Sequence, residues 1–286
     1  MTWRVPLKEI ENFYDSKTQA LLHRYGPGPR VHYHAGIFDQ LEPLDTSPDI
    51  LKKGIIASQE RLLEHAAKVW NASSTLCGEI LDAGCGLGGG SLFWAQNFGA
   101  QVTAVTIASS HIPLITKFAA QAGVSSQVSP FAYNVVEFPG YNRFDAAVAF
   151  ESVCHMPRQA LFQRMAELLR PGGRFFIADY FFEQPQYEAV WREHWYSPLG
   201  SFHEYLVAAQ EAGFQQETFE DTSLQTAHFW AMSAVLVQAE ARQKEQSTAK
   251  IEEALQPHRM TREGLINGGL RHALMSFVNE NNVSFR

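Results

Sequence analysis

Between about residues 79 and 182 the chain alternates short apolar runs with polar-faced stretches of helical length. The apolar runs are EILDAG, QVTAVTI, VSPFAYN, FDAAVAFE and RFFIADYF, and glycines or a Pro-Gly-Gly turn end the helical stretches between most of them. A strand that is apolar at nearly every position is buried on both faces, which is typical of a parallel sheet covered by helices. The pattern therefore predicts an α/β fold with a doubly wound, mostly parallel sheet.

Helical patterns also precede and follow this region. Residues 8–24 and 47–70 are predicted to form helices, and the alternating VHYHAGIFD between them predicts a short extended segment. After residue 182 come an aromatic stretch, a helix, a sixth strand in FQQETFEDTS, and helical segments at about 226–254 and 260–279. We expect three parts: an N-terminal helical cap (1–58), a core with an aromatic insertion near 182–200 (59–225), and C-terminal helices with a short last strand at VSFR (226–286).

Composition limits the classes of function. The 286 residues are 45% hydrophobic and carry a net charge of −7, which does not favour nucleic acid or an anionic membrane as a partner. No apolar run approaches the roughly 20 residues of a membrane-spanning helix, and the N-terminus lacks the apolar stretch of a signal peptide. The three cysteines form neither a metal-binding pair nor a disulfide framework. We therefore expect a cytoplasmic protein.

The loop LDAGCGLGGG follows the first apolar run and precedes a helix. Gly84, Gly86 and Gly88 permit a tight turn and let a ligand approach the backbone, while the N-terminus of the helix favours negative charge. Two ligands compete for such a loop. A dinucleotide requires an acidic residue about 20 positions later, but no Asp or Glu lies between Ala83 and Val136. A nicotinamide-dependent oxidoreductase is therefore disfavoured.

The segment Asp82–Gly88 has the pattern Asp-x-Gly-x-Gly-x-Gly, and Glu167–Tyr180 reads ELLRPGGRFFIADY. Both resemble signatures of the class I S-adenosylmethionine (SAM) methyltransferases. The resemblance implies a Rossmann-like sheet of seven strands, with SAM across the carboxyl ends of the first strands. It assigns to cofactor binding Asp82, Gly84, Gly86, Gly88, Thr106, Ser109, His111, Asn134 and Glu151. Helix capping near Thr106, Ser109 and His111, and a plain turn at Asn134, are the alternatives.

Glu151 follows the apolar run FDAAVAF, and His155 lies one helical turn later. The crevice of an open parallel sheet lies off the carboxyl ends of its strands, so Glu151 is expected beside the methyl donor. An alkene carbon that accepts a methyl group becomes a cation, which needs an anion or an aromatic face nearby and finally a base. Glu151 can supply both roles, unless it only starts a helix or pairs with Arg158 or Arg192. His155 is a general base of near-neutral pKa or a helix start.

The segments REHWYSPLGSFHEYL, AHFWAMSAV and HYHAGI, with Phe13-Tyr14-Asp15, are similar to parts of the terpenoid C-methyltransferases that methylate geranyl diphosphate, and of the sterol methyltransferase-like group. The resemblance implies that Glu151 stabilises the cation, that Trp195 faces it, and that a diphosphate with Mg²⁺ lies under the cap. We expect substrate contacts from Tyr14, Tyr25, Arg30, His32, His34, Trp195, Tyr196, Phe229 and Trp230. No metal ligand is assigned, and Mg²⁺ is expected only with a diphosphate.

The leading hypothesis is a SAM-dependent C-methyltransferase that acts on an alkene carbon of a small isoprenoid, either a prenyl diphosphate or a prenylated product. The main alternative is O- or N-methylation of a small aromatic or amine, with His155 or Glu151 as base. A catalytically silent SAM-binding module is a further alternative. Apolar helical faces beyond the needs of one core predict a homo-oligomer, as a hexamer or as a dimer with exchanged N-terminal helices.

Overall fold

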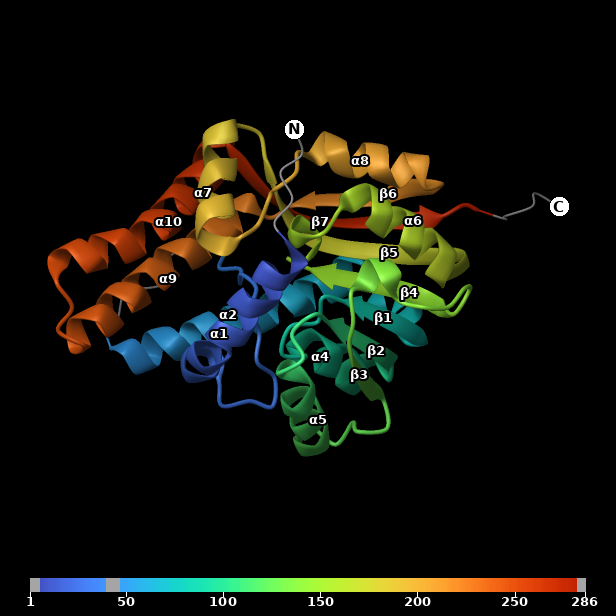
Figure 1. Ribbon diagram of the computed structural model, residues 1–286, viewed down its shortest axis with the longest axis horizontal. Coiled ribbons are helices and arrows are strands. Elements are labelled where there is room, and N and C mark those ends of the chain that lie inside the picture. The colour runs from blue at the N-terminus through green and yellow to red at the C-terminus, as the bar shows by residue number, and fades with distance from the viewer. Residues whose placement is uncertain (1–5, 40–46, 282–286) are drawn as a thin grey trace.

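The computed structural model describes residues 6–39 and 47–281 (Figure 1). These residues contain a seven-stranded sheet in the order β3-β2-β1-β4-β5-β7-β6. The pairs formed among β1 to β5 are parallel, whereas β7 runs antiparallel to both β5 and β6. This arrangement confirms the predicted doubly wound, mostly parallel sheet. The strands are β1 (Glu79–Ala83), β2 (Gln101–Thr106), β3 (Val128–Ala132), β4 (Phe144–Phe150), β5 (Leu169–Phe182), β6 (Phe214–Asp221) and β7 (Leu270–Asn279).

Helices cover both faces of the sheet. One face buries Phe162 of α6 and Tyr205 of α8, and the other buries Leu62 of α2, Trp94 of α4 and Ile115 of α5. In Figure 1, α1, α2, α7, α9 and α10 gather at the end of the sheet toward which β4 and β5 point. The helices are α1 (Leu7–Tyr25), α2 (Pro48–Val69), α3 (Ala72–Thr75), α4 (Gly89–Phe98), α5 (His111–Gln121), α6 (Arg158–Leu168), α7 (Pro185–Trp195), α8 (Phe202–Glu211), α9 (Ser223–Gln243) and α10 (Thr248–Asn267).

The strand β7 corrects two predictions. Residues 260–279 were expected to be helical and the last strand to be short, yet Leu270–Asn279 forms a strand of 10 residues that pairs with β5 from Phe182 to Arg174. Both faces of β7 are buried, so its sequence lacks the polar alternation that marks a half-exposed strand. Pairing between two neighbouring strands outweighs the helical preference of its Leu, Ala and Met residues. The expected strand at VSFR lies outside the described residues.

The segment Val31–Asp39 forms no strand. The amide of Gln59 holds it by donating to the carbonyl oxygens of His32 and His34, and the N–H of Ile37 donates to Ser58. The segment therefore runs along α2 as a fixed irregular stretch rather than as part of a sheet. Across residues 6–39 and 47–281, none of the helices combines the length and the apolar character that a bilayer crossing requires.

Candidate functional site

The loop between β1 and α4 needs glycine at three positions. Gly84, Gly86 and Gly88 have φ angles of +85°, +54° and +81°, a region that residues with side chains disfavour. A Cβ atom on Gly84 would also lie 2.5 Å from the Cβ of Ser152. The backbone therefore turns tightly over the end of β1, and α4 begins directly after the loop at Gly89.

A cavity of about 1290 Å³ lies at the carboxyl edge of the sheet, between the glycine loop, the ends of β2 and β4, and a cap made by α1 and residues 31–34. This volume is larger than most pockets for one small ligand, so a cofactor and an acceptor fit together. The predicted site residues that line it are Tyr14, His32, His34, Asp82, Gly84, Gly86, Thr106, His111, Asn134, Glu151 and His155. Those outside its lining are Tyr25, Arg30, Gly88, Ser109, Trp195, Tyr196, Phe229 and Trp230.

Polar groups of the first strands face the cavity. The nearly buried carboxyl group of Asp82 accepts a hydrogen bond from Ser91 at 2.5 Å. Burial raises its pKa to about 6, against the opposing effect of the Ser91 hydrogen bond. Thr106 accepts from the N–H of Ala108, and Asn134 from that of Val136. Thr106 and Asn134 thus make the local backbone contacts expected of cap and turn residues, and they also line the cavity.

This edge of the cavity fits SAM. A Cβ on Gly86 would meet no atom within 4 Å, so the loop leaves open space in front of its backbone. The indole N–H of Trp94 lines the cavity and is buried without a hydrogen-bond partner in the described part of the chain. An unfilled donor inside a cavity indicates a polar ligand. Asp82, Gly84, Gly86, Thr106 and Asn134 are the residues placed to hold it.

His111 links the glycine loop to the cap. Its Nδ1 lies 3.0 Å from the carbonyl oxygen of Gly86, and its Nε2 lies 3.1 Å from Oγ1 of Thr18 in α1. Burial lowers the pKa of His111. Its two ring nitrogens are occupied by protein atoms, so His111 orders the walls of the cavity. Next to it, Ser109 is exposed and points away from the lining.

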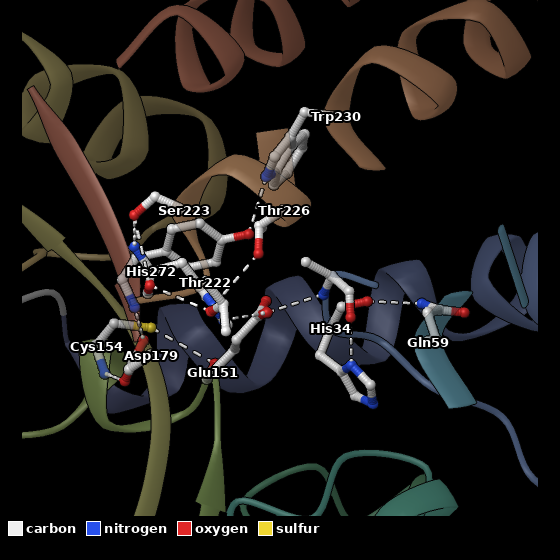
Figure 2. A network of polar contacts seen from close by, with 12 residues as sticks. His34, Gln59, Glu151, Cys154, Asp179, Thr222, Ser223, Thr226, Trp230 and His272 are labelled. Atoms are coloured by element: carbon white, nitrogen blue, oxygen red, sulfur yellow. Dashed lines mark hydrogen bonds and ion pairs between the residues drawn. The ribbon is translucent and has the colours of Figure 1, made fainter. Parts of the chain in front are cut away.

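Glu151 lies where the prediction requires, at the end of β4 and on the cavity (Figure 2). Its side chain is 10% exposed. Oε1 accepts the N–H of Ala35 at 2.9 Å and lies 3.3 Å from Nε2 of His272. Oε2 has no partner among the described residues, so one carboxylate oxygen is anchored and the other is available to a ligand.

The predicted alternative, in which Glu151 pairs with an arginine, is not what the described residues show. Arg158 donates to the carbonyl oxygen of Pro198 at 2.5 Å, and Arg192 pairs with Glu188 at 3.1 Å. The carboxylate of Glu151 therefore lies next to His272 and borders the cavity, where a ligand can contact it.

Sequence analysis missed His272. This residue of β7 is fully buried, and its Nδ1 lies 2.6 Å from Oγ1 of Thr222 (Figure 2). β7 runs antiparallel and His272 pairs with Tyr180, so the histidine reaches the same edge of the sheet as Glu151. Assigning the strand LRHALMSFVN correctly would have placed His272 at this edge; the helix assignment hid it.

His155 forms a pair with the cap. Its Nε2 lies 2.9 Å from the hydroxyl of Tyr14, and its Nδ1 lies 3.3 Å from the carbonyl oxygen of Tyr196. Burial lowers the pKa of His155 to about 4, below the near-neutral value expected from sequence, and burial raises the pKa of Tyr14 well above 10. Both groups are therefore neutral at pH 7, and Nδ1 donates to the carbonyl while Nε2 accepts from the hydroxyl. The lone pair of Nε2 is taken by the Tyr14 hydroxyl, so a ligand proton can reach this imidazole only through that hydroxyl.

The basic residues of the cap are mostly occupied. Arg30 and His32 both contact Glu60, at 3.0 Å and 2.8 Å. Glu60 thus already occupies both side chains, which weakens the predicted grip on a diphosphate. No three His, Cys, Asp or Glu residues gather into a potential metal-binding set within residues 6–39 and 47–281.

The predicted substrate-contacting rings of Trp195 and Trp230 do not line the cavity. Trp195 and Trp230 stack with Trp191 at centroid distances of 4.8 and 6.1 Å, and Trp230 donates to the hydroxyl of Tyr180. These rings form a packed layer between α7 and α9. Aromatic residues that do line the cavity include Tyr14, Tyr33 and Phe150. Residue type alone could not separate core rings from lining rings, because both kinds are large and apolar.

Comparison with known proteins gives a consistent result. Residues 80–173 match a family model described as a methyltransferase domain. The O-methyltransferase resE of Aspergillus sclerotiorum is 33% identical over 173 residues, which are 58% of this chain and 64% of that protein, less than two thirds of its length. The O-methyltransferase rstn1 of Aspergillus nomiae is 30% identical over 220 residues, which are 74% of this chain and 92% of that protein.

A solved structure shares the whole architecture. It is the geranyl diphosphate C-methyltransferase of Streptomyces coelicolor A3(2), crystallised with Mg²⁺, geranyl-S-thiolodiphosphate and S-adenosyl-L-homocysteine. The TM-score is 0.81 at 17% identity, over 96% of this chain and 97% of that one. The likeness supports the predicted resemblance to terpenoid C-methyltransferases at the level of the fold.

Proposed function

Because this chain belongs to the SAM-dependent methyltransferases, we propose that it methylates an alkene carbon of an isoprenoid bound beside Glu151. SAM supplies an electrophilic methyl group. The observation that carries the proposal is the carboxylate of Glu151, which is almost buried, lines the cavity and has no arginine partner within residues 6–39 and 47–281. A desolvated anion is the group that a carbon acceptor needs as it becomes positively charged.

The chain's own residues give this site its chemistry. Oε1 of Glu151 is fixed by the N–H of Ala35, so Oε2 is held toward the acceptor, where it stabilises the cation and then takes its proton. Tyr14, Tyr33 and Phe150 surround it with aromatic surface that excludes water. Arg30 and His32 both already contact Glu60. This favours a prenylated acceptor without a diphosphate over a prenyl diphosphate.

O- or N-methylation of a small aromatic or amine is the second candidate. The neutral His155 can take an acceptor proton by way of the Tyr14 hydroxyl, which donates to its Nε2. The O-methyltransferase names of the two Aspergillus relatives also favour this reaction. In that case Glu151 would orient the acceptor rather than stabilise a cation.

Replacing Glu151 distinguishes the two reactions. At about 4 Å and an effective dielectric constant of about 20, one carboxylate stabilises a positive charge by about 4 kcal/mol, or roughly 10³ in rate. We expect Glu151→Gln to lower turnover of an alkene acceptor by roughly 10³ while the Kd for S-adenosylhomocysteine stays within about threefold. The measurement is mass gain of one methyl group on prenyl alcohols, prenyl diphosphates and prenylated indoles, with calorimetry for the cofactor product.

The matched control is Glu217→Gln, which makes the same change on β6 in a pair with Arg174 outside the cavity. Its turnover should equal that of the wild type. A loss below about tenfold for Glu151→Gln, on an acceptor that carries O–H or N–H, would favour the second candidate.

A further inference from the structure

His34 lines the cavity and carries a buried polar atom without a partner among the described residues. The residue is 9% exposed. Its Nδ1 lies 2.6 Å from the carbonyl oxygen of Ala35, whereas its Nε2 is buried and has no hydrogen-bond partner among the residues the structure describes. Buried polar side-chain atoms without a partner are uncommon in folded proteins. One that borders a cavity therefore points to a ligand atom that completes it.

The contact at Nδ1 decides which ring nitrogen carries the hydrogen. A carbonyl oxygen can only accept, so Nδ1 must be the donor. Burial, with a smaller effect of the neighbouring His32, lowers the pKa of His34 to about 3, so the ring is neutral at pH 7. A neutral ring with its hydrogen on Nδ1 has a lone pair on Nε2. The unfilled atom is an acceptor, and it requires an O–H or N–H group.

The imidazole is held in one place. The amide of Gln59 donates to the carbonyl oxygen of His34 at 2.7 Å, and the ring packs against His32 and Phe150 at centroid distances of 5.0 and 5.3 Å. Figure 2 shows the chain at His34 tied on one side to Gln59 and on the other to Glu151. The imidazole is therefore held in one orientation, with little entropy left to lose on binding.

We propose that Nε2 of His34 accepts a hydrogen bond from a hydroxyl or N–H group of the bound ligand. Two ligands can supply this group. SAM carries ribose hydroxyls and an ammonium group, and a methyl acceptor supplies it if it is a prenyl alcohol or a prenylated indole. The acceptor alternative rests on the proposed function, whereas the SAM alternative rests only on membership of the family.

Three variants test the role of Nε2. His34→Phe keeps a ring of similar size against Phe150 and removes the acceptor, and His34→Gln restores an acceptor oxygen. His65→Phe makes the first change on α2, where the histidine pairs with Glu220 outside the cavity lining. Thermal unfolding checks that each variant is folded. Calorimetry then measures Kd for S-adenosylhomocysteine, for geraniol against geranyl methyl ether, and for 3-prenylindole against its N-methyl analogue.

If SAM is the source, His34→Phe weakens S-adenosylhomocysteine binding about tenfold, while His34→Gln recovers most of it and His65→Phe leaves it unchanged. If the acceptor is the source, the wild type binds the alcohol or the indole about tenfold better than its capped analogue, and His34→Phe loses that preference. The proposal is overturned if His34→Phe leaves the cofactor Kd unchanged and the wild type shows no preference in either pair. Failure of the isoprenoid function alone would leave the cofactor result standing.

Discussion

Glu151 has a backbone conformation that residues with side chains rarely adopt, with φ of +47°. Such a conformation costs about 1–3 kcal/mol. Two contacts offset it: the N–H of Glu151 donates to Ala178 at 2.7 Å, and Oε1 accepts the N–H of Ala35. The left-handed turn directs the carboxylate off the end of β4 and across to the cap, instead of continuing the strand. The strained backbone of Glu151 thus determines where its carboxylate lies.

His272 should act on the reaction through Glu151. His272→Leu removes a buried ring nitrogen that lies 3.3 Å from Oε1 without hydrogen-bonding to it. Because the contact lacks hydrogen-bond geometry, we expect kcat to fall by at most about tenfold, with an unchanged Kd for S-adenosylhomocysteine. His272→Gln, which keeps a donor, should recover part of the loss. Thr226→Val, which removes a longer contact to Nδ1, should have a smaller effect; equal losses in kcat and in cofactor affinity would contradict the positioning role.

At the scale of elements, the unit from β1 through the glycine loop to α4 follows from local sequence. An apolar run, glycines with positive φ and a helix start are each marked by neighbouring residues, so Asp82 and Gly84 could be placed without a structure. β7 could not be recognised as a strand from its own sequence, because it forms a strand by pairing with β5 on one side and β6 on the other. The lining role of Tyr33 and the packing role of Trp195 depend likewise on how α1 and α7 dock.

The helix α10 carries a histidine that should make the fold sensitive to acid. Burial lowers the pKa of His258 to about 3, so the folded state binds fewer protons than the unfolded state. Its contribution is complete above the unfolded pKa of about 6.5 and is lost as the pH falls below it. Between pH 7 and pH 5 the loss is about 2 kcal/mol.

Denaturant unfolding at the two pH values measures this effect. We expect His258→Phe to lose about 2 kcal/mol less than the wild type on going from pH 7 to pH 5. The solvent-exposed His23 gives a matched variant, His23→Phe, whose pH dependence should follow that of the wild type. Identical pH dependence of the wild type and His258→Phe would show that His258 is protonated in the folded state.

At the scale of the molecule, the cap and the sheet form one chamber. Tyr14 contacts His155, Thr18 contacts His111 and Asp15 accepts from Ser110, so α1 is tied to three separate points around the cavity. Closure of this kind keeps water from the reacting groups.

Oligomerisation remains a prediction at this scale. Leu224 of α9 and Ile266 of α10 are 62% and 50% exposed, in keeping with helices that have apolar surface left over. We expect light scattering after size exclusion to give at least twice the 32.1 kDa of one chain. A single species at the mass of one chain would contradict this expectation.

The position of β7 has a consequence for synthesis of the chain. β6 leaves the ribosome about 50 residues before β7, yet in the sheet it pairs only with β7. During translation the edge of β5 and the whole of β6 therefore wait unpaired, a state that invites association with other nascent chains. His272 arrives with the same strand, so the carboxylate that we place at the reaction centre gains this buried neighbour only after the sheet has been completed.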